Sequence, residues 1–109
     1  MMTGLTKLQL CNNSIETIDN LEMLVNLKEL DLSFNKLAKI ENLDALAKLE
    51  VLTLFQNRIQ IIENIENLTC LTVFSIGNNK ISDYSNVSNR SLCFFRSNLK
   101  AKSLHERHI

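Results

Sequence analysis

The stretch Leu27–Leu37 reads LKELDLSFNKL, with leucines at its first, fourth, sixth and eleventh positions and an asparagine at its ninth. Neither the 3.6-residue period of a helix nor the two-residue period of a strand explains this spacing over the whole stretch. The same arrangement recurs every 22 residues along the chain. A fixed period of this length indicates a repeat architecture.

Four repeats start at Leu5, Leu27, Leu49 and Leu71, with apolar residues at offsets 1, 4, 6, 11, 14, 17 and 20 and asparagine at offset 9. The first three repeats match at every position, and the fourth departs only where Arg90 replaces the last apolar residue. We divide the chain of 109 residues into a lead-in at 1–4, repeats at 5–26, 27–48, 49–70 and 71–88, and a non-repetitive basic tail at 89–109.

The pattern L-x-x-L-x-L predicts a short strand whose leucines at offsets 4 and 6 point into the interior. We therefore expect an α/β solenoid with a curved parallel sheet on the concave side and short helical turns on the convex side. A second set of asparagines, each before an apolar-spaced run, is expected to cap those helical turns: Asn20, Asn42, Asn64 and Asn86. The run LCFF at Leu92–Phe95 is expected to cover the last coil.

The asparagines at offset 9 follow each predicted strand, where the chain must turn. An asparagine amide donates to backbone carbonyls and accepts from backbone amides. Stacked at every coil, these side chains are predicted to form a buried ladder: Asn13, Asn35, Asn57 and Asn79.

The other strand positions face outward and are the candidate binding surface. Our hypothesis is that an apolar group anchors a partner protein within a charged rim. The anchor residues are Phe55, Val51 and Val73, and the rim residues are Glu29, Asp31 and Lys7. A second interpretation is that Phe34 and Phe55 fold over the turn after the strand and cover the ladder. Both interpretations stay open at the level of sequence.

No constellation of catalytic residues is apparent. The two histidines, His105 and His108, lie in the tail, where their spacing is more typical of chance than of a metal pair. With only Gly4 and Gly77, a glycine-rich phosphate loop is not possible. The sequence therefore predicts a non-enzymatic protein without catalytic, cofactor-binding or metal-binding residues and without a small-molecule substrate.

Net charge is zero, but it is unevenly distributed. Residues 1–88 contain seven Lys and Arg against eleven Asp and Glu, whereas residues 89–109 contain five against one. A mildly acidic body argues against nucleic acid as a partner.

No apolar run is long enough to span a bilayer, and no leader is evident. The three scattered cysteines are typical of a reducing compartment. We expect a cytoplasmic protein.

The 22-residue pattern L-x-x-L-x-L-x-x-N-x-I-x-x-I-x-x-L-x-x-L-x-x resembles the leucine-rich repeat family, in the short intracellular subtype found in a protein phosphatase regulatory subunit and in many ciliary proteins. Four segments are similar to leucine-rich-repeat, coiled-coil subunits of the nexin–dynein regulatory complex: LDLSFN (Leu30–Asn35), IENLDALAKLE (Ile40–Glu50), LFQNRI (Leu54–Ile59) and SIGNNKI (Ser75–Ile81).

This resemblance implies a cytoskeletal scaffold in the axoneme of cilia or flagella, in contact with other subunits of that complex and with proteins of the doublet microtubules. The chain begins within the repeat array and lacks the coiled-coil continuation, which points to a truncated or alternative form. Two other functions remain open. One is a regulatory subunit that binds a protein phosphatase catalytic subunit, and the other is the substrate-recognition arm of a ubiquitin ligase.

Overall fold

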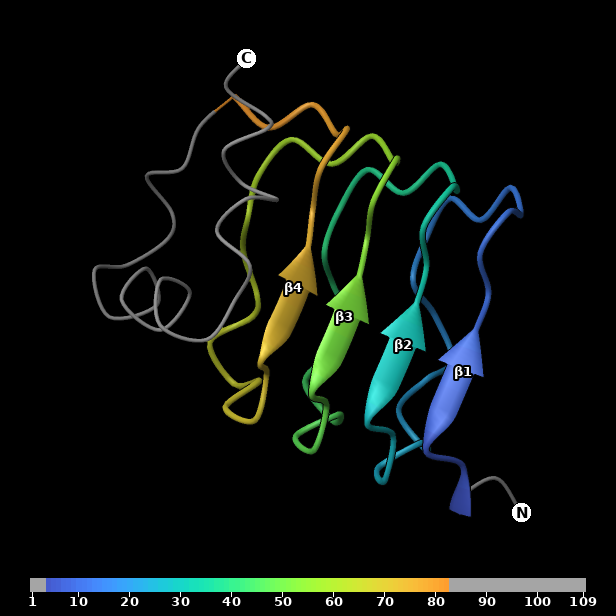
Figure 1. Ribbon diagram of the computed structural model, residues 1–109, viewed down its shortest axis with the longest axis vertical. Coiled ribbons are helices and arrows are strands. Elements are labelled where there is room, and N and C mark those ends of the chain that lie inside the picture. The colour runs from blue at the N-terminus through green and yellow to red at the C-terminus, as the bar shows by residue number, and fades with distance from the viewer. Residues whose placement is uncertain (1–3, 83–109) are drawn as a thin grey trace.

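A computed structural model describes residues 4–82 of the chain. Four short strands fall one in each predicted repeat: β1 (Lys7–Gln9), β2 (Glu29–Asp31), β3 (Val51–Thr53) and β4 (Val73–Ser75). They form one parallel sheet in the order β1-β2-β3-β4 (Figure 1). The predicted solenoid of about four repeats is confirmed.

The register of the sheet follows the 22-residue period. Leu8 pairs with Leu30, Leu30 with Leu52, and Leu52 with Phe74, so equivalent offsets lie side by side across all four strands. Because side chains alternate across a strand, the whole column of offset-4 residues points to one side. Leu30, Leu52 and Phe74 are at most 1% exposed, which places them in a single apolar interior.

The return limbs contain two successive turns each, and no α-helix occurs among the residues that the structure describes. In the second coil, the amide of Leu46 donates to the carbonyl of Leu43, and the amide of Leu49 donates to that of Leu46, each at 3.0 Å. These are bonds between residues three apart, as in a 3₁₀-helix. The apolar residues of the limb are also three apart, so each turn points one of them into the core.

The prediction that the second asparagine set caps helices is wrong for Asn20, Asn42 and Asn64. Their φ angles are 61°, 61° and 62°, whereas an N-cap residue has an extended backbone. Asparagine is enriched several-fold in this left-handed region relative to other residues with a side chain. Asn42 Nδ2 donates to the carbonyl of Ile18 at 2.7 Å, and Asn64 Nδ2 donates to that of Ile40 at 2.7 Å. Asn42 and Asn64 therefore each tie their coil to the preceding one.

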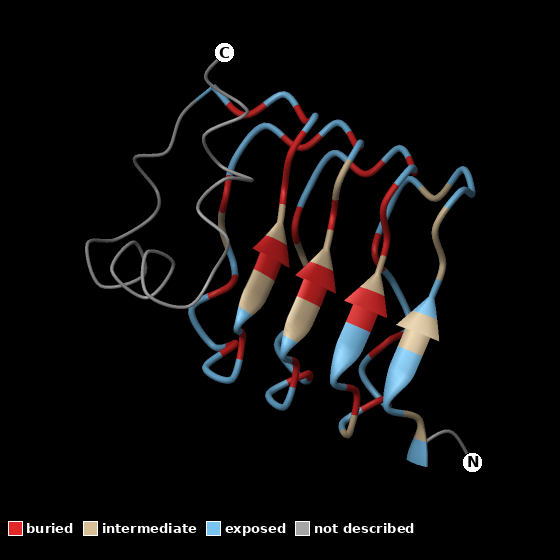
Figure 2. Ribbon diagram, viewed as in Figure 1, coloured by how far each residue is buried: buried red, intermediate tan, exposed pale blue. Residues whose placement is uncertain are grey.

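The first coil is less buried than the others. The apolar residues that pack only partly against the core are Leu5, Leu8, Leu10 and Ile15. Figure 2 shows no buried segment on β1, whereas β2, β3 and β4 each carry one.

Three predictions fall outside the described residues: the cap at Asn86, the cover at Leu92–Phe95 and the basic tail.

Candidate protein-binding surface

The face of the sheet that points away from the core carries the side chains at offsets 3 and 5. Along β2, Glu29 is exposed, Leu30 is buried and Asp31 is half-buried. Along β3, Val51 and Thr53 are half-buried on either side of the buried Leu52. The core uses only one side of the sheet, so the other side, which we call the open face, remains available for contact with another molecule.

The charged end of the open face lies over β1 and β2. Lys7 Nζ is 3.8 Å from Glu29 Oε1, and these side chains are 57% and 48% exposed. Such an exposed ion pair contributes little to stability. Asp31 is held differently, because its Oδ1 accepts hydrogen bonds from the amide of Ser33 at 3.0 Å and from the Ser33 hydroxyl. A shallow groove of about 110 Å³ runs over this end, lined by residues 7–9, 29–31, 51 and 53.

The apolar end lies over β3 and β4. Val51 and Val73 are paired across the two strands, and both are half-buried. Phe55 follows β3 and is also half-buried. Its ring contacts that of Phe34 edge to face, with centroids 5.6 Å apart and an interplanar angle of 62°. Val51, Val73 and Phe55 thus occupy the third and fourth coils, and the predicted rim residues lie on the first and second coils.

The aromatic pair fits both interpretations made from the sequence. The turn beneath it holds the ladder, because Asn57 Nδ2 donates to the carbonyl of Phe55 at 3.4 Å. Phe34 nevertheless keeps 47% of its surface exposed, so part of its ring is accessible to a partner. The role of Phe55 as an anchor therefore stays a prediction.

Sequence reasoning missed the backbone at offset 8. Phe34 has a φ of 58°, and the equivalent residues Asn12, Gln56 and Asn78 have φ angles of 61°, 60° and 54°. Asparagine at two of these four positions was the available signal, because it favours this region. A bulky aromatic residue there is unusual, and strained backbone conformations concentrate at functional sites.

The offset-9 asparagines lie directly behind this surface and fix it. Asn57 Nδ2 donates to the carbonyls of Leu32 in the preceding coil and Leu54 in its own coil, and its Oδ1 accepts from the amide of Leu37. Asn35 and Asn79 make the equivalent bonds, and these three side chains are 7% to 8% exposed. Asn13 is exposed and bonds only to carbonyls of its own coil.

Residues 4–82 contain no group of three or more His, Cys, Asp or Glu side chains that could hold a metal ion. His105 and His108 lie outside this range. In the same part of the chain, no helix has the length and apolar character required to cross a bilayer.

The sequence profile described as "Leucine Rich repeats (2 copies)" matches residues 3–45 and 47–89. The chain belongs to the leucine-rich repeat family. No curated protein is similar enough to count as a relative. Members of the leucine-rich repeat family are typically non-enzymatic interaction scaffolds.

Among solved structures, an internalin from Listeria monocytogenes is 31% identical with a TM-score of 0.72, over 82% of this chain and 26% of that chain. Internalin C2 from the same bacterium is 32% identical with a TM-score of 0.67, over 84% and 38%. A chain of the Drosophila melanogaster SNF/U2A' complex is 31% identical with a TM-score of 0.69, over 86% and 54%.

This chain therefore spans between about a quarter and about half of the length of these neighbours. The family and the neighbours support a protein–protein interaction module.

Proposed function

We propose that this chain is a scaffold subunit of the nexin–dynein regulatory complex, which links doublet microtubules and regulates dynein-driven motility in cilia and flagella. Its place would be the axoneme, in contact with other subunits and with proteins of the doublet microtubules. What supports this proposal is the similarity of LDLSFN (Leu30–Asn35), IENLDALAKLE (Ile40–Glu50), LFQNRI (Leu54–Ile59) and SIGNNKI (Ser75–Ile81) to dynein regulatory complex subunit 3. The finding that the chain is an interaction module is compatible with it.

The observation that carries a binding role is the open face, where apolar side chains stay half-exposed while the core behind them is closed. Val51, Val73 and Phe55 remain in contact with water although Leu52 and Phe74 are almost completely buried. Burying such side chains against a partner is favourable at about 25 cal/mol per Å² of apolar surface. We therefore place the anchor of the interface at these three residues.

The charged end of the open face would set the orientation of the partner. Glu29 and Lys7 are exposed and opposite in charge, so a partner with the complementary pair can dock in one direction only. Asp31 contributes charge, but its carboxylate is already bonded to Ser33 and is less free to reorient. Rim charges of this kind act mainly on specificity and on the association rate.

Proximity labelling in ciliated cells tests the assignment. A biotin ligase fused to the chain is expected to label dynein-regulatory and doublet-microtubule proteins. Labelling of a phosphatase catalytic subunit would favour the phosphatase-regulatory function, and labelling of ubiquitin machinery would favour the ligase arm. A fusion whose labelling matches that of a freely diffusing ligase would contradict all three.

The anchor itself is tested with Phe55→Ala in a pull-down of the labelled partners. We expect loss of binding with a melting temperature that changes little. Ile61→Ala is the matched control, because Ile61 lies in the same coil, is 38% exposed and is not on a strand of the open face. Normal binding together with lowered stability in Phe55→Ala would support the covering interpretation instead.

A further inference from the structure

Three basic residues form a column along one edge of the solenoid. Lys36, Arg58 and Lys80 occupy offset 10 of successive coils, and all three are exposed. Their backbone amides donate to the carbonyls of the preceding coil, at Ile15, Leu37 and Ile59, each at 2.8 Å. The positions of the three residues are therefore fixed by the same hydrogen bonds that stack the coils. We call this column the basic ridge.

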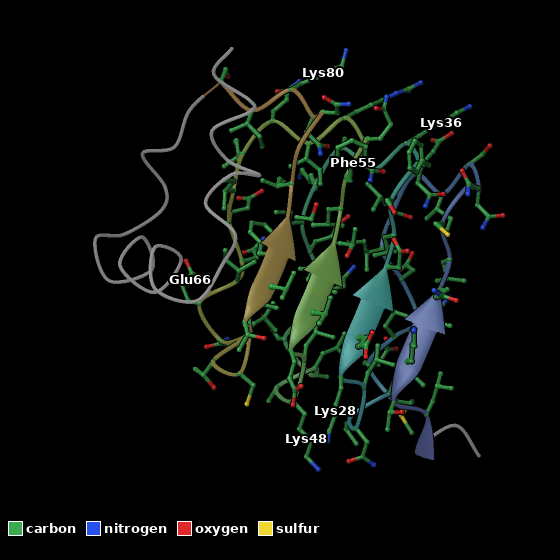
Figure 3. All side chains as sticks on the ribbon, viewed as in Figure 1. Lys28, Lys36, Lys48, Phe55, Glu66 and Lys80 are labelled. Atoms are coloured by element: carbon green, nitrogen blue, oxygen red, sulfur yellow. The ribbon has the colours of Figure 1, made fainter. Side chains whose placement is uncertain are left out.

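The basic ridge lies beyond the ends of the strands. Figure 3 shows Lys36 and Lys80 at the edge past the arrowheads, with Phe55 close to this edge, whereas Lys28 and Lys48 lie at the opposite edge. Neighbouring parallel strands are about 4.8 Å apart, so the ridge presents three cations within about 10 Å. Like charges held this close repel one another, and an anion beside them offsets this repulsion.

The described chain supplies no such anion. Between residues 4 and 82, the one ion pair joins Lys7 to Glu29, on the open face rather than on the ridge. By contrast, Lys48 at the opposite edge donates to Asn26 Oδ1 at 2.8 Å. The three ridge cations are therefore available to a partner.

Phe34 adds an apolar element next to the ridge. It lies two residues before Lys36, is 47% exposed, and holds a left-handed backbone with a φ of 58° that an aromatic residue rarely adopts. Its ring contacts that of Phe55 edge to face. Aromatic residues, including phenylalanine, and arginine are enriched at protein interfaces.

The remaining charges limit the size of the ligand. Residues 4–82 contain seven Lys and Arg and ten Asp and Glu. Acidic residues form two columns at offsets 15 and 18, namely Asp19, Glu41 and Glu63, and Glu22, Asp44 and Glu66. A long polyanion such as nucleic acid would meet this acidic surface as well as the ridge. Charges farther away than the screening length of about 8 to 10 Å have little effect, so a short acidic segment meets mainly the ridge.

We propose that the basic ridge and Phe34 bind a short acidic peptide segment of a partner protein. The segment runs along the ridge, its carboxylates contact Lys36, Arg58 and Lys80, and one apolar side chain packs on Phe34. Successive residues on one side of an extended peptide are about 6.6 Å apart, so two or three alternating carboxylates match the length of the ridge. The inference does not depend on the ciliary assignment.

Fluorescence anisotropy with the full chain tests the proposal. The probe is a fluorescein-labelled peptide, Glu-Glu-Glu-Leu-Glu-Glu-Glu, and the same peptide with Gln in place of Glu is its neutral counterpart. We expect saturable binding of the acidic peptide that weakens as salt is raised, and no binding of the neutral one. Absence of saturable binding by the acidic peptide would overturn the proposal.

A charge reversal locates the site. Arg58→Glu with Lys80→Glu is expected to weaken binding about tenfold or more. The matched control is Lys28→Glu with Lys48→Glu, which changes the net charge equally at the opposite edge and is expected to weaken binding by no more than about twofold, because screening separates the two edges. Equal weakening in both double variants would overturn the ridge as the site, since it would reflect net charge alone.

Substitution of Phe34 separates anchoring from folding. Phe34→Asn is expected to keep or raise the melting temperature, because Asn12 and Asn78 hold the same backbone conformation in other coils. It is also expected to weaken binding of the acidic peptide about fivefold, since the apolar contact is lost. Met23→Asn, at a side chain that is 69% exposed on a return limb, is the control and should leave binding unchanged.

Two further results would overturn the proposal. In the first, an oligothymidylate of the same charge as the acidic peptide competes as effectively as the unlabelled acidic peptide does. This result would identify a general anion site. In the second, analytical ultracentrifugation shows a salt-sensitive dimer that the Arg58→Glu, Lys80→Glu variant does not form. Such a dimer would mean that the acidic columns of a second copy of the chain occupy the basic ridge.

Discussion

The first and third coils carry the same sequence pattern in different surroundings. Leu52 in the third coil is 0% exposed, whereas the equivalent Leu8 is only partly buried. Asn57 is 7% exposed and bonds across two coils, whereas Asn13 is exposed and bonds within its own coil. The third coil has a described coil on both sides, whereas the first coil has one on one side only.

This comparison teaches that burial in this fold belongs to the contact between coils rather than to the pattern within a coil. A solenoid gains its stability from such nearest-neighbour contacts. Three of the four substitutions below are therefore paired with the same substitution in the first coil, and the difference between the two measures the contribution of a second neighbouring coil.

The largest difference is expected for the core leucines. Leu52→Ala should lower the free energy of unfolding by about 3 kcal/mol, since it removes a fully buried side chain and leaves a cavity between two coils. Leu8→Ala should lower it by about half as much or less, because water reaches Leu8 in the folded protein. Urea denaturation followed by circular dichroism measures both. Equal losses would mean that the first coil is as well packed as the third.

The ladder asparagines give the next largest difference. Asn57→Leu is expected to cost about 1 to 3 kcal/mol, because it leaves the amide of Leu37 without its partner and removes one donor each from the carbonyls of Leu32 and Leu54, which keep their bonds to Asn35 and Asn79. Asn13→Leu should cost about 0.5 kcal/mol or less, since water replaces the lost bonds at an exposed site. The same denaturation experiment applies. An unchanged stability in Asn57→Leu would remove the ladder from the account of the fold.

The sequence predicted the solenoid, because apolar spacing at 22 residues has one physical solution: coils that stack and share an interior. It predicted short helical turns on the return limb, but not that bonds between residues three apart close them. The spacing of three between Leu43, Leu46 and Leu49 carried that information, since a turn closed by bonds between residues three apart points every third residue inward. The asparagines were expected to cap the helical turns because asparagine before an apolar run is also typical of an N-cap.

The candidate site was less predictable than the fold. Alternation along the strands placed Val51, Val73 and Glu29 on the open face. It could not give the left-handed backbone of Phe34 or the contact of its ring with Phe55, because both depend on the turn after the strand. The bond between Asp31 and Ser33 is equally local to the folded turn.

The left-handed asparagines allow a finer comparison. Asn64→Gly keeps the backbone conformation without strain, since glycine adopts positive φ freely, and removes only the bond of 2.7 Å to the carbonyl of Ile40. We expect a loss of about 1 kcal/mol. Asn20→Gly should cost about 0.5 kcal/mol or less, because no described coil precedes it to accept the bond. A similar loss at both sites would assign the effect to glycine in the unfolded chain rather than to the contact between coils.

The smallest effect is expected for the ion pair between β1 and β2. Lys7→Met keeps the apolar stem of the side chain and removes the charge that faces Glu29 at 3.8 Å. With both groups about half exposed, we expect a loss of about 0.5 kcal/mol or less at low salt and none at high salt. Denaturation at the two salt concentrations measures it. A loss larger than that of Leu8→Ala would mean that charge, rather than the shared leucine interior, joins the first coil to the array. The difference between the first and third coils would then have an electrostatic cause.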